Sequence, residues 1–145
     1  MNKNSGSCLC GKVQFSVHQN IQIIYHCHCS LCRKQSGTGS NAATLVNETL
    51  FEWIAGIDLI KTFKKDTGFT SCFCVHCGSP VPNKVGQSPF IWIPLGLLQE
   101  DLMIQQRLGF CLHSKRCWSP AISIDKQYQE LPSWHELQDY FDKSY

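Results

Sequence analysis

The chain has 145 residues, of which 43% are hydrophobic and 17% charged, so it is long enough to bury the core of a single domain, 1–145. Its formal net charge is only +2 and it has no long run of Lys or Arg, which argues against nucleic-acid binding. Its most apolar run, PFIWIPLGLL, is short and contains proline and glycine, which argues against a membrane span.

The strands and the helix that the sequence predicts follow one another along the chain. Short β-rich runs bounded by Gly, Pro or Ser predict strands. These runs are KVQFSV (12–17), LIKTFKK (59–65), FTSCFCV (69–75), PFIWIPL (89–95) and AISI (121–124). Near the C-terminus, Ser133 and Glu136 have the spacing of a capping box. The helix that they begin would place Trp134, Leu137 and Phe141 on one face, which we expect to pack against the sheets. The predicted fold class is all-β with one short C-terminal helix.

Ten cysteines are unusual for this length, and eight of them lie in three clusters. The clusters are SCLCG with Cys8 and Cys10, CHCSLC with Cys27, Cys29 and Cys32, and CFCVHCG with Cys72, Cys74 and Cys77. A disulfide scaffold is one interpretation, but residues 1–6 are polar and lack the apolar segment of an export signal. We therefore expect a cytoplasmic protein with reduced thiols. The sulfurs of a Cys-x-x-Cys motif can converge on one ion, and a tetrahedral set of thiolates selects zinc or, less often, iron.

Eight clustered thiols allow two assignments, which differ in chemistry. In the first, each of two zinc ions has four thiolates, and both sites are structural. In the second, one site is closed and the other has three thiolates and an open position that can be catalytic. The closed site would then consist of Cys8, Cys10, Cys74 and Cys77, and the open one of Cys27, Cys29 and Cys32. Spacing does not decide between them, because Cys72 can supply a fourth thiolate or point into the core from its strand.

Residues beside the middle cluster are candidates for further roles. Arg33 and Lys34 follow it directly and could offset its negative charge or bind carboxylates, or they could be a solvated pair in a turn. His26 and His28 flank Cys27 and could replace a thiolate or relay a proton. Ligation by thiolates is the favoured interpretation, because thiols stand at the matching positions.

The remaining cysteines and aromatic residues have simpler interpretations. We expect residues 35–37 to continue a loop past the cluster. Cys111 and Cys117 are interpreted as a buried small apolar residue and a loop thiol, not as a third metal site. Trp53, Trp92 and Trp118 are expected in the core or in a pocket wall.

Four segments together resemble a known family. GSCLCGKVQF near the start, CHCSLCRKQSG about twenty residues on, F..CVHCGSP in the middle and SKRCW followed by LP near the end are similar to the glutathione-dependent formaldehyde-activating enzyme and centromere protein V family. The resemblance covers about residues 5–134. It implies a β-tent fold of antiparallel sheets held by zinc.

The resemblance also implies which cysteines bind metal. Carried over by position, it implies a structural zinc on Cys8, Cys10, Cys74 and Cys77, and a second, catalytic zinc on Cys27, Cys29 and Cys32. The chain departs from the family at Gly109, where members often carry a His, and at Cys117, where a proline is common. Cys72 is not a ligand that the family requires. These departures leave both metal sites intact and put the substrate in question.

The chemistry of an open three-thiolate site favours sulfur substrates. Three thiolates leave a divalent ion with a net charge of about −1, so it acidifies bound water less than a zinc with three imidazoles does. We therefore expect a carbon–sulfur lyase acting on glutathione, or on another thiol adduct of a small carbonyl compound such as formaldehyde. The alternative is a non-catalytic protein-binding module with two structural zinc ions. Self-association of the chain is left open by the sequence.

Overall fold

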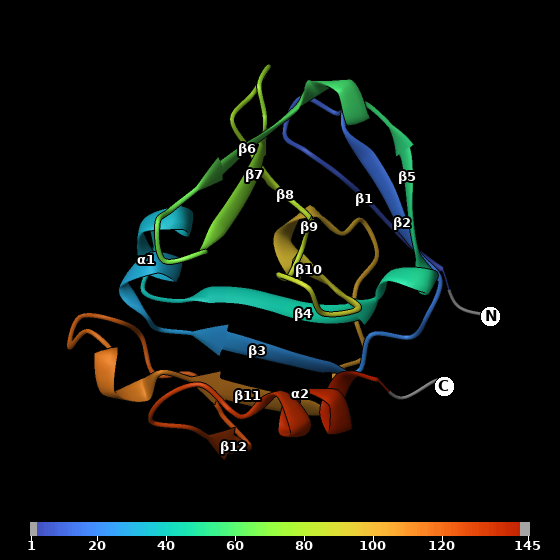
Figure 1. Ribbon diagram of the computed structural model, residues 1–145. Helices are drawn as coiled ribbons and strands as arrows, with labels where there is room; N and C mark the ends of the chain where they lie inside the picture. The colour runs from blue at the N-terminus through green and yellow to red at the C-terminus, as the bar shows by residue number, and fades with distance from the viewer. Residues whose placement is uncertain (1–2, 143–145) are drawn as a thin grey trace. The chain divides into compact units, whose positions relative to one another are not determined.

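The computed structural model describes residues 3–142 (Figure 1). These residues belong to two compact units. The first unit includes residues 3–20 and 45–101, and the second includes 21–44 and 102–142. Strands dominate both units, which confirms a mostly β protein. None of the helices within residues 3–142 is long and apolar enough to cross a membrane.

The first unit contains two three-stranded antiparallel sheets and a hairpin. The first sheet has the order β1-β2-β5, with β1 at Asn4–Ser7, β2 at Gln14–Val17 and β5 at Phe51–Ala55. The second has the order β6-β7-β8, with β6 at Ile60–Lys64, β7 at Thr70–Cys74 and β8 at Pro80–Val81. The hairpin pairs β9, Asn83–Lys84, with β10, Phe90–Pro94. Three 3₁₀ turns accompany them: η1 at Glu48–Leu50, η2 at Ile57–Leu59 and η3 at Leu95–Leu97.

The core of the first unit follows from strand alternation. Val13, Phe15 and Val17 are buried, as the alternation of KVQFSV predicts. The ring of Phe15 lies 5.6 Å from the ring of Phe51 and 6.3 Å from that of Trp53, measured between centroids. These aromatic contacts hold β2 and β5 together on their buried face.

The second unit is a mixed sheet with helices at its strand ends. Its strands have the order β12-β11-β3-β4. They are β3 at Ile23–Cys27, β4 at Asn41–Asn47, β11 at Gln106–Phe110 and β12 at Lys126–Gln127. The last three residues of β4 belong to the first unit. The helical elements are α1 at Ser30–Ser36, η4 at Leu112–Ser114 and α2 at Trp134–Phe141. Because β11 runs parallel to both β3 and β12, the expectation of purely antiparallel sheets is wrong here.

Helix α2 begins where the sequence predicts. The Ser133 side chain accepts a hydrogen bond from the backbone N–H of Glu136 at 3.2 Å, and the reciprocal contact of a capping box is also present. Leu137 and Phe141 are buried, and the Phe141 ring meets Tyr25 of β3 edge-on at 6.1 Å. The helix therefore packs on the sheet of the second unit as expected, but Trp134, which was predicted on the same face, is 51% exposed.

Replacing Ser133 by alanine is expected to destabilise the protein by about 1 kcal/mol, because the cap of α2 loses its acceptor. For a chain of this size the thermal midpoint should fall by about 4 °C. Thermal unfolding followed by circular dichroism would measure the shift. Ser133→Asp is the matched control, since aspartate also caps well, and an equal loss in both variants would contradict the capping role.

Two segments differ from their predictions. Residues 121–124 form no strand, although AISI is β-rich. Residues 35–36 end helix α1 where a loop was expected. Gly37 caps this helix with φ +69°, a left-handed conformation that favours glycine, and its N–H donates to the Arg33 carbonyl oxygen at 2.8 Å.

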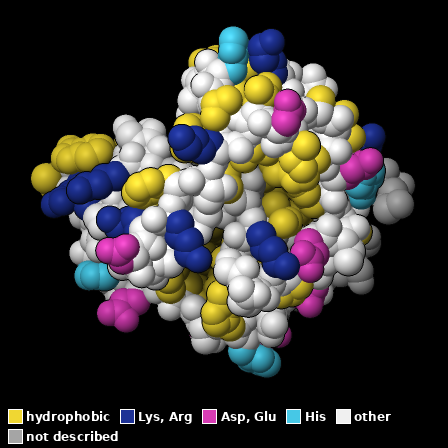
Figure 2. Space-filling model, turned by 45° about the horizontal axis from the view of Figure 1, so that its top comes forward, with side chains coloured by type: hydrophobic (Ala, Val, Ile, Leu, Met, Phe, Trp, Pro, Cys, Tyr) yellow, Lys and Arg dark blue, Asp and Glu magenta, His cyan; other side chains and the backbone are white. Residues whose placement is uncertain are grey.

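Each unit leaves some large hydrophobic side chains exposed. Figure 2 shows hydrophobic side chains at the surface beside Lys and Arg on the face that it draws. Trp92 is buried and Trp53 packs on the core of the first unit, as predicted, but Trp118 is 65% exposed. The core or pocket-wall position expected for Trp118 is therefore wrong.

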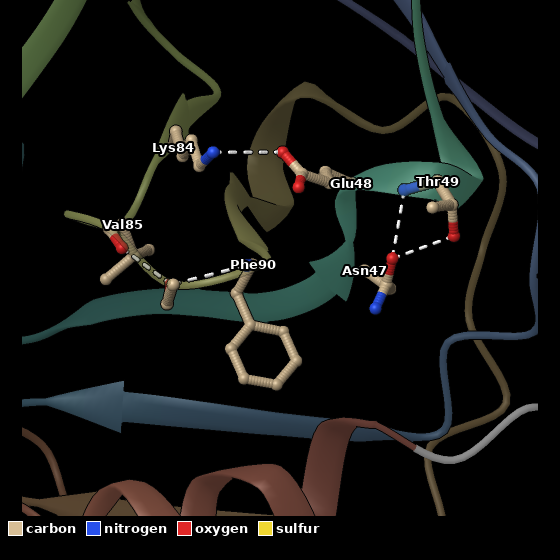
Figure 3. Close-up of polar contacts among 7 residues, drawn as sticks. Asn47, Glu48, Thr49, Lys84, Val85 and Phe90 are labelled. Atoms are coloured by element: carbon tan, nitrogen blue, oxygen red, sulfur yellow. Dashed lines mark hydrogen bonds and ion pairs between the residues drawn. The ribbon is translucent and has the colours of Figure 1, made fainter.

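Polar contacts fix the turn that follows β4 in the first unit. The Asn47 side-chain oxygen accepts hydrogen bonds from the Thr49 backbone N–H at 3.0 Å and from its hydroxyl at 2.7 Å (Figure 3). Glu48 pairs with Lys84 of β9 at 3.2 Å, but both side chains are exposed, so the pair contributes only about 0–1 kcal/mol. The cap made by Asn47 is the more important of these contacts.

Candidate metal centres

The first group of cysteines lies in the core of the first unit. Cys8 and Cys10 follow β1, Cys74 ends β7, and Cys77 lies in the turn beyond it. Their four sulfurs lie within 4.8 Å of one another. Cys10 Sγ is 3.5 Å from Cys8 Sγ and 3.9 Å from Cys74 Sγ. A tetrahedral zinc with bonds of about 2.3 Å separates its sulfurs by about 3.8 Å, so the group fits such an ion.

The backbone around this group supports the sulfurs. Val13 N–H donates to Cys8 Sγ at 3.3 Å, and the Ser79 hydroxyl lies 3.4 Å from Cys77 Sγ. The hydrogen bond with Ser79 is the main reason that the pKa of Cys77 falls to about 5. The Ser79 hydroxyl oxygen also accepts a hydrogen bond from the Leu9 N–H at 2.9 Å. This bond links the segment that carries the first two cysteines to the segment that carries the last two. The chain thus orients these sulfurs and favours, at Cys77, the thiolate form that a metal requires.

Cys72 belongs to neither of the two groups of clustered sulfurs found within residues 3–142. It is buried in the core of the first unit, beside Cys74 and Val81. Its sulfur lies 3.3 Å from the hydroxyl of Thr62 on the paired strand β6. Of the two positions that the sequence left open, Cys72 takes the one in the core.

The second group is built at the junction of β3 and α1 in the second unit, where the chain turns into the helix (Figure 1). Cys27 ends β3, Cys29 is the N-cap of α1, and Cys32 lies in its first turn. The Cys29 sulfur accepts a hydrogen bond from the Cys32 N–H at 3.4 Å. The three sulfurs lie within 4.8 Å of one another. A cysteine therefore caps this helix in the position that Ser or Asp usually occupies.

The three thiols of the second group differ in pKa. Hydrogen bonds from Cys27 and Cys32 lower the pKa of Cys29 to about 2. Hydrogen bonding with Cys29 and then with Cys32 raises the pKa of Cys27 far above its usual range. Without a cation the group therefore favours one thiolate held by two thiols, and a divalent ion would offset the repulsion that further thiolates create.

A cavity of about 360 Å³ in the second unit is lined by His28, the residue between Cys27 and Cys29, but by none of the three cysteines. The His28 ring is buried, and its Nδ1–H donates to the Phe110 carbonyl oxygen at 3.2 Å, which leaves Nε2 as an acceptor. Lys115 is the cation among the lining residues. The other lining residues, mostly apolar or amide side chains, are Leu112, Ala121, Ile122, Ile124, Gln127 and Gln129. The cavity is large enough to hold part of a small organic ligand.

The predicted neighbours of the cluster have other positions. Arg33 Nε donates to the His28 carbonyl oxygen at 3.3 Å, so it braces the loop, and Lys34 is exposed. His26 belongs to neither sulfur group, and burial lowers its pKa. None of these three side chains lines the cavity.

Cys111 is a residue whose position the sequence did not predict. It is buried, as expected, but its thiol forms a hydrogen bond with the thiol of Cys27. It follows β11, whose last residue, Phe110, is the parallel partner of Cys27. No spacing rule connects two cysteines so far apart in sequence, so the pairing of β11 with β3 was the missing information.

Gly109, a departure from the family, also lies in this unit. A Cβ atom at Gly109 would meet Leu112 at 2.8 Å and Ile124 at 3.2 Å. Both neighbours line the cavity. Their apolar side chains take the space into which a larger residue at 109 would extend.

Comparisons with known proteins place the chain in a family. The family model described as glutathione-dependent formaldehyde-activating enzyme matches residues 3–114, more than half of the chain. No curated protein matches. A crystal structure of a Rhodobacter sphaeroides protein is similar in fold, with 20% sequence identity, a TM-score of 0.57 and coverage of 67% of this chain and 89% of that one. The chain belongs to the glutathione-dependent formaldehyde-activating enzyme family.

Proposed function

We propose that this protein is a zinc-dependent carbon–sulfur lyase that forms and cleaves thiol adducts of small carbonyl compounds, with glutathione as the thiol. The observation that carries the proposal is the difference between the two sulfur groups. Within residues 3–142, one group has four sulfurs and the other has three. A four-thiolate site is closed and structural, whereas a three-thiolate site leaves a position for a substrate.

The proposed cofactor is one zinc ion in each group. When bound to Cys27, Cys29 and Cys32, zinc would offer its open position to a soft sulfur ligand and hold that sulfur as a thiolate. The reaction joins the thiol sulfur to the carbonyl carbon. The carbonyl double bond becomes a single bond, and the thiol proton ends on the oxygen. The reverse reaction returns thiol and carbonyl compound.

Residues of the second unit supply the proposed contacts to the adduct. His28 lines the cavity, and its free Nε2 can accept a hydrogen bond from the hydroxyl that the carbonyl oxygen becomes. Lys115 lines the same cavity and can bind a carboxylate of glutathione. With the adduct bound there, the apolar part of the lining would shield the reacting carbon from water.

Exchange spectroscopy tests this function directly. With ¹³C-labelled formaldehyde and glutathione, the zinc-loaded protein should accelerate exchange between formaldehyde hydrate and S-hydroxymethylglutathione. Two-dimensional exchange NMR measures both rates in one sample. The same protein stripped by a chelator is the control and should return exchange to the uncatalysed rate.

The assay can also refute the proposal. If a protein carrying two zinc ions per chain fails to accelerate exchange, formaldehyde activation with glutathione is wrong for this chain. If acceleration persists after both ions are removed, the metal has no part in it. Acceleration with other thiols but not with glutathione would assign a different thiol.

A further inference from the structure

The structure places a fourth cysteine beside the three-cysteine group. Cys111 lies in the second unit, one residue beyond the end of β11. Parallel pairing sets Phe110 of β11 opposite Cys27 of β3, so the chain delivers Cys111 to the end of β3 where the group is built. Two bonds from His28, backbone N–H at 3.0 Å and ring Nδ1 at 3.2 Å, both reach the Phe110 carbonyl oxygen and fix this junction.

The side chain of Cys111 is turned toward the group. It is only 7% exposed, and its thiol forms a hydrogen bond with Cys27. Its sulfur is outside the set in which every pair lies within 4.8 Å. Cys111 thus flanks the group on the side of Cys27.

The backbone of Cys111 adopts a conformation that cysteine rarely takes. Its φ of +56° makes it the one non-glycine residue with positive φ among residues 3–142. The conformation is held by its N–H, which donates to the Glu130 carbonyl oxygen at 3.2 Å, and by its carbonyl, which accepts from Ser114 N–H at 3.0 Å. Glycine would fit this position without strain, so removing the sulfur need not harm the fold.

We propose that Cys111 is an exchangeable fourth sulfur ligand of the metal held by Cys27, Cys29 and Cys32. In the absence of substrate, the Cys111 sulfur would fill the fourth position and close the site. A substrate thiol would displace Cys111, and the thiol proton would pass to the released sulfur. The total number of thiolates stays constant in this exchange. The inference deepens the proposed function and rests on it for the identity of the competing thiol.

Cobalt substitution measures this ligand without any activity assay. Sulfur-to-cobalt charge-transfer absorption increases with the number of thiolates bound to Co²⁺. Protein loaded with two Co²⁺ ions per chain is compared with Cys111→Gly and Cys111→Ser. The variants should lose about one eighth of the absorption, because one of two four-thiolate sites becomes a three-thiolate site. Cys117→Ser, which removes an exposed thiol, is the matched control and should match the unchanged protein.

Glutathione separates this inference from the proposed function. Added to the cobalt-loaded protein, it should leave the absorption nearly unchanged, since one thiolate replaces another, and it should restore the missing absorption of Cys111→Gly. Full absorption in Cys111→Gly before glutathione is added would overturn the fourth-ligand role. A deficit that glutathione does not restore would support Cys111 as a ligand and count against glutathione as the substrate.

Discussion

The Cys74→Ser variant is expected to bind one metal ion instead of two and to show no cooperative unfolding transition on heating. Cys74 is fully buried, and its sulfur lies 3.9 Å from that of Cys10 in the four-cysteine group. The apparent binding free energy of a structural zinc is about 10–16 kcal/mol, as large as the whole stability of a typical domain. The fully buried side chains of the core around Cys74 are only valines and cysteines, and the larger ones packed against them, such as Trp53 and Leu59, are only partly buried.

Metal analysis and thermal unfolding of the same samples test this expectation. Cys72→Ser is the matched control, because Cys72 is buried in the same core and on the same strand but belongs to neither sulfur group. It should keep both ions and lose about 1–3 kcal/mol for burying a hydroxyl in place of a thiol. Loss of an ion from Cys72→Ser with none lost from Cys74→Ser would reverse the assignment.

The cysteines show how far sequence spacing can predict a site. Cys-x-x-Cys motifs are local, so the sequence identified the thiols of both groups. The partner of each local motif is a matter of tertiary structure. Cys8 meets Cys74 because β1 and β7 belong to one unit. Spacing left that choice open, and the family resemblance supplied it.

Helix α1 shows a different limit. Its sequence, SLCRKQS, has 7 residues, fewer than the about 10–14 of an average helix, and none of them is buried, so it has no apolar period to detect. Its cap is Cys29, a residue that is not usual at that position. In contrast, α2 has a capping box and buries Leu137 and Phe141, and it was predicted correctly.

Residues 121–124 show how composition can mislead. Isoleucines at alternate positions predict a strand, but Ile122 and Ile124 line the cavity and do not pair in a sheet. Their apolar side chains form part of the cavity wall, together with Leu112. The sequence indicates only that these residues are apolar. Whether they pack in a sheet or in a cavity wall depends on long-range contacts.

Cys29→Ser is expected to separate catalysis from folding. Serine is a favoured N-cap, so the variant keeps the cap of α1 while it removes one of three thiolates from the second metal. The aromatic core of this unit, in which Tyr25 stacks on Phe110 at 4.5 Å, does not depend on Cys29. We therefore expect a folded protein that retains the first metal and loses or weakly holds the second.

The activity of Cys29→Ser should fall on the order of 100-fold or more, since a catalytic metal supplies several kcal/mol of transition-state stabilisation and about 1.4 kcal/mol corresponds to a tenfold change in rate. Cys29→Ala is the matched variant. It should lose the same activity and about 1 kcal/mol more stability than Cys29→Ser, because alanine cannot cap α1. Exchange NMR and thermal unfolding measure the two effects separately. If Cys29→Ser unfolds as Cys74→Ser does, the second metal is structural and the protein-binding alternative gains support. If it folds and keeps full activity, catalysis lies outside the three-cysteine group.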